Sequence, residues 1–138
     1  MHPPVKTVSS TSDMLRQLAA DIVAYARKQG ASASAAEASE GFGQTVSVRQ
    51  GAVETIEYNR DKGLSVTVYL GQKRGNASTS DFSRAAVHDT VDAALNIARF
   101  TAEDDCAGLP DADKLAAEFT DLDLYHPWQI NVDQSIEL

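Results

Sequence analysis

Hydrophobic residues recur at helical spacing near the start of the chain. They form one apolar stripe: Leu15, Leu18, Ile22, Val23 and Ala26. The stripe predicts a helix over residues 13–29, with Ser10 or Ser12 as its N-cap and Gly30 just beyond its end. Residues 1–11 are polar and contain two prolines, so we expect them to be a flexible lead.

The period changes from helical to strand-like after residue 30. Small apolar and polar residues alternate over residues 31–35, a pattern that favours a strand and is also compatible with a poor helix. Two glycines within residues 41–43 suggest a bulge or bend, after which the alternation resumes at Val46. Gln50-Gly51 then predicts a tight hairpin turn.

The clearest strand covers residues 64–70. It places Leu64, Val66, Val68 and Leu70 on one face and Ser65, Thr67 and Tyr69 on the other. A strand over residues 52–59 precedes it, across a predicted turn at residues 60–63 in which Gly63 takes the left-handed conformation. A turn at residues 71–75 leads to a short polar strand over residues 76–80, which we expect at a sheet edge.

A second apolar stripe at helical spacing follows the strands. It comprises Ala86 or Val87, then Val91, Ala94, Leu95 and Ala98, with Asp81 or Ser83 as the N-cap. The order of elements is α-β-β-β-β-α, which predicts an α+β fold. In it, a four-stranded antiparallel meander carries two helices on its Leu64–Leu70 apolar face. This domain is expected to span residues 12–109.

The chain becomes acidic and less regular after Pro110. Acidic residues are frequent here, at Asp111, Asp113, Glu118, Asp121 and Asp123. Residues 131–138 have the pattern of a helix start, with Asn131 or Asp133 as its cap. We therefore expect residues 110–138 to be an acidic linker and the beginning of a further helix, leading to a domain that is missing from this sequence.

Composition narrows the classes of function. The 138 residues are 43% hydrophobic and 23% charged, which fits one globular domain. A net charge of −8 argues against a nucleic-acid partner, because phosphate binding needs clustered Lys and Arg. A single cysteine, Cys106, excludes an intrachain disulfide, and the sequence has no apolar stretch of membrane-spanning length. We expect a cytoplasmic protein without membrane attachment.

Residues that carry chemistry are sparse. His88 and Asp92 lie four apart on the second predicted helix, but a metal site needs three or four ligands, so a surface or half-buried histidine is the favoured interpretation. The acidic run at residues 103–105 is interpreted as a solvated helix end, and Cys106 has no neighbouring base to activate it. We predict no catalytic, cofactor-binding or metal-binding residue in this chain.

The polar side of the predicted sheet is the best candidate for a contact surface. Its candidate residues are Thr55, Ser65, Thr67, Tyr69, Ser78 and Ser80. An ordinary solvent-facing side of an antiparallel sheet is the favoured interpretation, and contact with a second domain or subunit is the alternative. The edge strand over residues 76–80 is also suited to accept an added peptide strand.

Several blocks of the sequence resemble the N-terminal domain of the PmbA/TldE family. They are Arg49-Gln50-Gly51-Ala52-Val53-Glu54, Glu57-Tyr58-Asn59-Arg60-Asp61-Lys62-Gly63-Leu64, Gly75-Asn76-Ala77-Ser78-Thr79-Ser80-Asp81 and Asp121-Leu122-Asp123-Leu124-Tyr125-His126-Pro127-Trp128. The likeness extends over residues 19–138, and the block at residues 58–63 is typical of the PmbA branch. This family belongs to the TldD/PmbA superfamily, historically called modulators of DNA gyrase.

The resemblance implies a non-catalytic domain in a cytoplasmic metalloprotease that acts on peptides and unfolded chains. In this family the zinc site belongs to a TldD-like partner subunit, and none of the three histidines here matches its HExxxH motif. The alternative hypothesis is a free-standing peptide-binding or dimerisation module, and whether the assembly is a homo-oligomer or a hetero-oligomer stays open. A DNA-linked regulator, as the older family name suggests, is disfavoured by the net charge.

Overall fold

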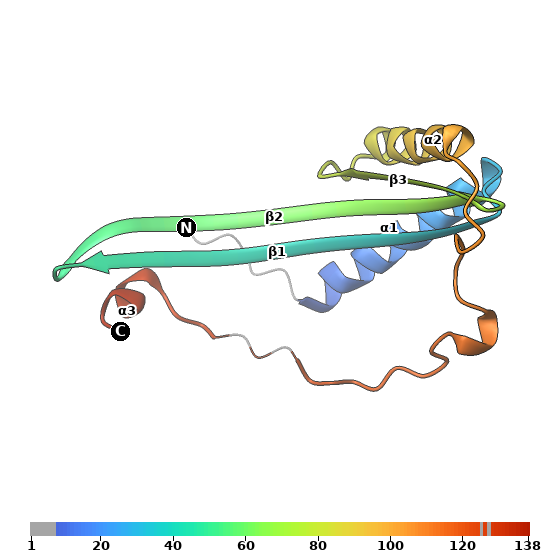
Figure 1. Ribbon diagram of the computed structural model, residues 1–138. Coiled ribbons are helices and arrows are strands. Elements are labelled where there is room, and N and C mark those ends of the chain that lie inside the picture. Colours follow the sequence, from blue (N-terminus) through green and yellow to red (C-terminus); the bar gives the residue numbers. More distant parts are fainter. Residues whose placement is uncertain (1–7, 125, 127) are drawn as a thin grey trace. The chain divides into compact units, whose positions relative to one another are not determined.

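The computed structural model describes residues 8–124, 126 and 128–138 (Figure 1). Its elements are α1 (Val8–Lys28), β1 (Ala33–Arg49), β2 (Ala52–Leu70), β3 (Lys73–Thr79), α2 (Arg84–Phe100), the short 3-10 helix η1 (Ala112–Lys114) and α3 (Val132–Ile136). The chain divides into two compact units, each described by itself below. The first contains the residues up to Glu40 together with Lys62–Leu109, and the second contains Gly41–Asp61 together with Pro110–Leu138.

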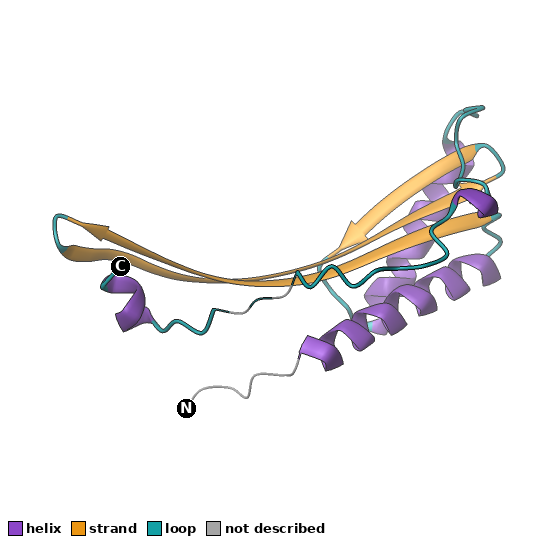
Figure 2. Cartoon of the chain, turned by 90° about the horizontal axis from the view of Figure 1, so that it is seen from below, coloured by secondary structure: helices purple, strands orange, loops and turns teal. Residues whose placement is uncertain are grey.

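The core of the first unit lies between the sheet and both long helices. Alternate residues of β2 point into it and pack against residues of α1 and α2. Figure 2 shows both helices next to the sheet. Its buried members are Ile22, Ala26, Leu64, Val66, Val68, Val87, Val91, Ala94, Leu95 and Ala98. The predicted α+β architecture, with two helices on the apolar face of an antiparallel sheet, is therefore confirmed.

The small residues of β3 allow α2 to approach the sheet closely. Gly75 is buried and lies against the backbone of α2, where a Cβ atom on Gly75 would meet the carbonyl oxygen of Ala94 and come within 2.6 Å of the Ala98 nitrogen. Ala77 packs against the same core. A larger side chain at residue 75 has no space unless the helix moves away.

The number of strands differs from the prediction. Among the described residues the sheet has three strands in the order β1-β2-β3, not four, because β2 continues through residues 60–63 where a turn was expected. Gly63 does not adopt a positive φ, and a Cβ atom there would lie 3.7 Å from Ser39 Oγ of β1. Pairing along a long partner strand thus overrides the local turn preference of Arg60-Asp61-Lys62-Gly63.

β1 is also longer than the pattern suggested. It runs without interruption from Ala33 to Arg49, so residues 41–43 do not break it as expected. The hairpin turn at Gln50-Gly51 is confirmed: φ is 54° at Gln50 and 77° at Gly51. Two consecutive positive φ values are the requirement of a type I′ turn, which matches the twist of the strands on either side.

Helix boundaries are partly as predicted. α1 begins by Val8, so Ser10 and Ser12 lie within the helix instead of capping it, and the expected lead is helical from residue 8. Residues 1–7 of that lead lie outside the described residues. Ser83 caps α2 as predicted, since its side chain accepts a hydrogen bond from the Ala86 backbone N–H. The helix ends at Phe100, before the acidic run.

The second unit combines a β-hairpin with the C-terminal part of the chain. The hairpin consists of residues 41–49 of β1 and 52–61 of β2, and it leaves Phe42, Val53, Ile56 and Tyr58 exposed. α3 is capped by Asn131, whose side chain accepts from the Gln134 N–H while the Gln134 side chain accepts from the Asn131 N–H. This capping box stabilises a helix of only five residues.

Candidate functional site

A hydroxyl-rich face lies on the side of β2 and β3 that points away from the core. The antiparallel register places Ser65 opposite Ser78, and Thr67 opposite Asn76. The Asn76 side chain donates hydrogen bonds to Thr67 Oγ1 at 2.9 Å and to the Val66 carbonyl oxygen at 3.1 Å. The predicted alternation of β2 therefore produces a real polar face with cross-strand contacts.

The six candidate contact residues do not form a single group. Ser65 and Thr67 are half-buried, and Ser78 and Ser80 are exposed, all within the first unit. Two of the six, Tyr69 and Thr55, are not part of an open polar face in the first unit.

Tyr69 is only 8% exposed, so most of its ring is unavailable to a partner. Its backbone carbonyl accepts hydrogen bonds from the Ser32 N–H and hydroxyl. Thr55 is exposed but belongs to the second unit. The group that the structure brings together is Ser65, Thr67 and Ser78, with Ser80 just beyond the end of β3.

An open groove of about 310 Å³ lies beside this group in the first unit. Its lining residues are Glu37, Ser39, Lys62, Gly63, Leu64, Ser65, Ser78, Thr79 and Ser80. Glu37 and Ser39 were not predicted as site residues, although the alternation within β1 indicates which face they occupy. Ala36 and Ala38 pack against the core, so period-two alternation directs Glu37 and Ser39 to the opposite face.

Charged groups next to the groove are held by local contacts. Lys62 Nζ lies 5.2 Å from the centre of the Phe82 ring, a cation–π geometry. The Ser83 backbone N–H donates to Asp81 Oδ1 at 2.8 Å. This bond, a second hydrogen bond with the Ser83 side chain and the positive charge of Lys62 lower the pKa of the exposed Asp81 carboxyl below its ordinary value.

We expect the Asp81→Asn substitution to destabilise the first unit in a pH-dependent way. A carboxyl whose native pKa is lowered stabilises the fold above its unfolded pKa, and this contribution disappears as the pH falls through the native pKa. Urea unfolding of both proteins between pH 7 and pH 2 is the measurement. The wild type should be more stable at pH 7, and the two curves should converge at the acidic end; a gap that persists at the lowest pH would contradict this account.

His88 is half-buried, which agrees with the interpretation that the sequence favoured over a metal ligand. Its ring stacks on Tyr25 of α1 with centroids 3.9 Å apart and planes 3° apart, so it fastens α2 to α1 as a half-buried aromatic contact. Within the described parts of the chain, no three His, Cys, Asp or Glu side chains come together in a group that can hold a metal ion. His2 lies outside those residues.

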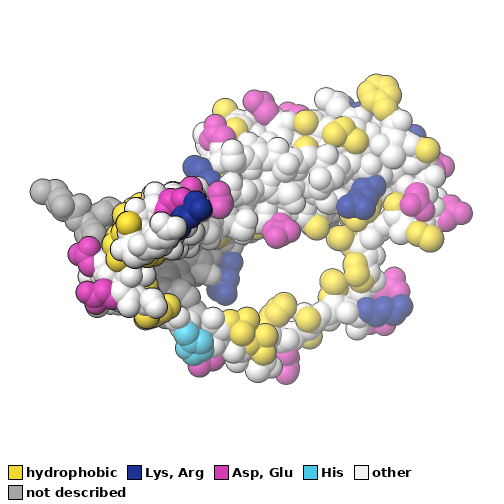
Figure 3. Space-filling model, turned by 60° about the vertical axis from the view of Figure 1, so that its left-hand side comes forward, with side chains coloured by type: hydrophobic (Ala, Val, Ile, Leu, Met, Phe, Trp, Pro, Cys, Tyr) yellow, Lys and Arg dark blue, Asp and Glu magenta, His cyan; other side chains and the backbone are white. Residues whose placement is uncertain are grey.

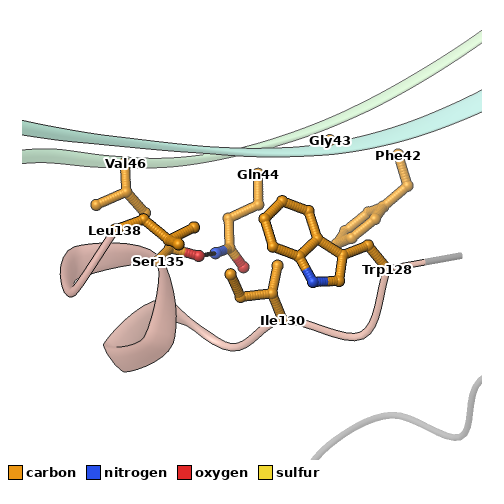
Figure 4. A pocket seen from close by; sticks show the side chains of 8 residues that line it. All are labelled: Phe42, Gly43, Gln44, Val46, Trp128, Ile130, Ser135 and Leu138. Carbon is orange, nitrogen blue, oxygen red and sulfur yellow. Dashed lines mark hydrogen bonds between the residues drawn. The ribbon is translucent and has the colours of Figure 1, made fainter.

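A second groove, of about 370 Å³, lies within the second unit (Figure 4). Phe42, Gln44 and Val46 of β1 face Trp128, Ile130 and Leu138 across it. Gln44 Nε2 donates to Ser135 Oγ at 3.2 Å, which ties α3 to the hairpin. Most of the Phe42, Trp128 and Leu138 side chains remain exposed, at 76%, 73% and 85%. This groove was not predicted.

Comparison with known proteins identifies the family. The model for PmbA/TldA metallopeptidase domain 1 matches residues 35–98. The Metalloprotease PmbA homolog of Haemophilus influenzae is 46% identical over 124 residues, covering 90% of this chain and 27% of that protein. The chain belongs to the PmbA/TldD family. Metalloprotease PmbA of Escherichia coli O157:H7 is 48% identical over 96 residues, covering 70% of this chain and 21% of that protein.

Solved structures show the same fold at lower identity. A protein described as a modulator of DNA gyrase from Bacteroides thetaiotaomicron superposes with a TM-score of 0.69 at 20% identity, covering 77% of this chain and 24% of that chain. TldE from Thermococcus kodakarensis gives 0.61 at 12% identity, covering 68% and 21%. The chain thus spans about a quarter of the length of the PmbA relatives it matches. In the described part of the chain, no helix has the length and apolar character to cross a membrane.

Proposed function

We propose that this chain is the first domain of a PmbA/TldE-type subunit in a metalloprotease and that it acts as a scaffold and partner contact. The observation that carries the proposal is the 46% identity over 124 residues to a protein named as a metalloprotease PmbA homolog. In this proposal the catalytic zinc belongs to a TldD-like partner subunit. The substrates are peptides or unfolded chains, and the complex is cytoplasmic.

The polar face of the first unit supports a contact role. Ser65, Thr67 and Ser78 present hydroxyl groups on a sheet surface whose other side is covered by α1 and α2. Hydroxyl groups on a rigid sheet provide hydrogen bonds to a partner without the cost of desolvating a charge. In this proposal residues 12–109 form the contact domain, and residues 110–138 form the linker that follows it.

The test is reconstitution with the TldD-like subunit encoded in the same genome. We expect the untagged 138-residue chain to be retained by the immobilised TldD-like subunit and to show no chelator-sensitive cleavage of casein by itself. Retention by an unrelated immobilised protein is the control. Zinc-dependent cleavage by the purified chain alone would overturn the non-catalytic role, and a lack of retention would overturn the partner contact.

A free-standing peptide-binding or dimerisation module is the second candidate. One observation favours it: β3 forms an edge of the sheet among the described residues, and an edge strand can pair with an added strand. Light scattering after size-exclusion chromatography, combined with titration of an unfolded polypeptide such as reduced casein, separates this candidate from the first. A monomer without affinity for unfolded chains would exclude it.

A further inference from the structure

The segment between α2 and α3 exposes an unusual amount of apolar surface. Residues 111–124, here called the acidic segment, contain only the three residues of η1 as regular structure. Four large apolar side chains along it are mostly exposed: Leu115 at 55%, Phe119 at 88%, Leu122 at 68% and Leu124 at 82%. Figure 3 shows hydrophobic side chains exposed beside acidic ones along the segment. Several large exposed apolar side chains within one segment are typical of an interaction site.

The size of this surface suits a protein partner. A covered aromatic side chain removes roughly 150–250 Å² from water, and the segment offers Phe119 and, four residues beyond its end, Trp128. Together with its three leucines, these residues approach the roughly 800 Å² that one partner contributes to a standard interface. A small ligand would cover only a fraction of it.

The charge of the segment indicates the chemistry of the surface that covers it. The acidic segment contains five acidic residues and one lysine. Lys114 is already paired with Asp111 at 3.0 Å, and His126 lies 3.9 Å from Asp123. Asp113, Glu118 and Asp121 are exposed. A complementary surface therefore combines an apolar groove with Lys or Arg along its border.

One side-chain hydrogen bond shapes a local turn within the segment. The Asp121 carboxylate accepts a hydrogen bond from the Asp123 N–H at 2.9 Å, and Asp123 adopts a positive φ of 47°. Leu122 lies inside this turn and Leu124 directly follows it. Partial preorganisation lowers the entropy that binding must overcome.

We propose that the acidic segment docks as a peptide into an apolar groove bordered by Lys and Arg on the TldD-like subunit. This inference rests on the proposed function, since it specifies where the partner binds. Phe119 and Leu122 are the apolar anchors. The exposed carboxylates steer the approach, so binding weakens as salt screens them.

Binding of the 138-residue chain to the immobilised TldD-like subunit tests this proposal. We expect Phe119→Ser with Leu122→Ser to raise the Kd about tenfold or more, as expected for interface anchors. Glu118→Lys should raise the Kd less and flatten its dependence on salt between 50 and 300 mM (roughly the range over which the Debye length falls below 10 Å). Phe100→Ser is the matched control, because Phe100 is 91% exposed and lies in the first unit.

The outcomes separate this inference from the proposed function. If the wild-type chain does not bind the subunit at all, the proposed function fails first. If it binds and the Phe119/Leu122 variant binds equally well, the docking site is wrong while the proposed function stands.

Two other occupants would also overturn the inference. Light scattering that shows a dimer of this chain, dissociated by the Phe119/Leu122 substitutions, would assign the segment to a second copy. Hydrogen exchange can be measured on a full-length PmbA-type protein without the TldD-like subunit. Strong protection of residues 111–124 there would show that the rest of the same chain covers the acidic segment.

Discussion

Replacing Gly75 by alanine is expected to cost the first unit about 3 kcal/mol or more of unfolding free energy, the upper range for overpacking a core. The added Cβ atom would overlap the carbonyl oxygen of Ala94 and lie 2.6 Å from the Ala98 nitrogen. Both are backbone atoms of α2, so no side-chain rotation can relieve the overlap. The helix itself must move away from β3, and its contacts with the core loosen with it.

Gly43→Ala provides a matched control for this prediction. Gly43 is also a strand glycine without a positive φ, and an added Cβ atom there has no atom within 4 Å. Both substitutions change the strand preference of the backbone alike. Urea unfolding followed by circular dichroism should therefore show a large loss for Gly75→Ala and little change for Gly43→Ala. Equal losses of stability would show that the strand backbone, and not the close approach of α2, determines the effect of substitution at residue 75.

The sequence predicted the fold best in the elements whose hydrophobic periodicity matches the residues that the folded chain buries. The alternation of Leu64, Val66 and Val68 predicted the buried face of β2, and the stripe of α2 predicted its buried hydrophobic residues but not the buried Thr90. It misled at residues 60–63, where Asp61 and Gly63, two residues with strong turn preferences, lie inside a strand. Turn preference is a local property, whereas the continuation of β2 depends on the length of its partner strand β1. Residues 60–63 contain no information about that length.

The candidate site was predictable in its parts but not as a whole. The polar face of β2 followed from alternation, yet the burial of Tyr69 depends on its surroundings in the folded chain. Glu37 and Ser39 were missed because strands distant in sequence build the groove. The groove of the second unit was missed for a related reason: Phe42 and Trp128 are separated by more than half of the chain.

Ile22→Ala is expected to destabilise the first unit by about 2–4 kcal/mol, as other buried Ile-to-Ala truncations do. Ile22 is fully buried in the core that α1 shares with β2 and α2, so the truncation leaves a cavity between elements that cannot easily collapse. Ile97→Ala is the control: Ile97 is also an interior helix residue but is 48% exposed, so it should change stability by less than about 1 kcal/mol. Because both substitutions gain the same helix propensity, the difference measured in urea reports burial alone. A loss near zero for Ile22→Ala would mean that α1 does not share the core with α2 and β2, and the attachment of α1 to the sheet would need revision.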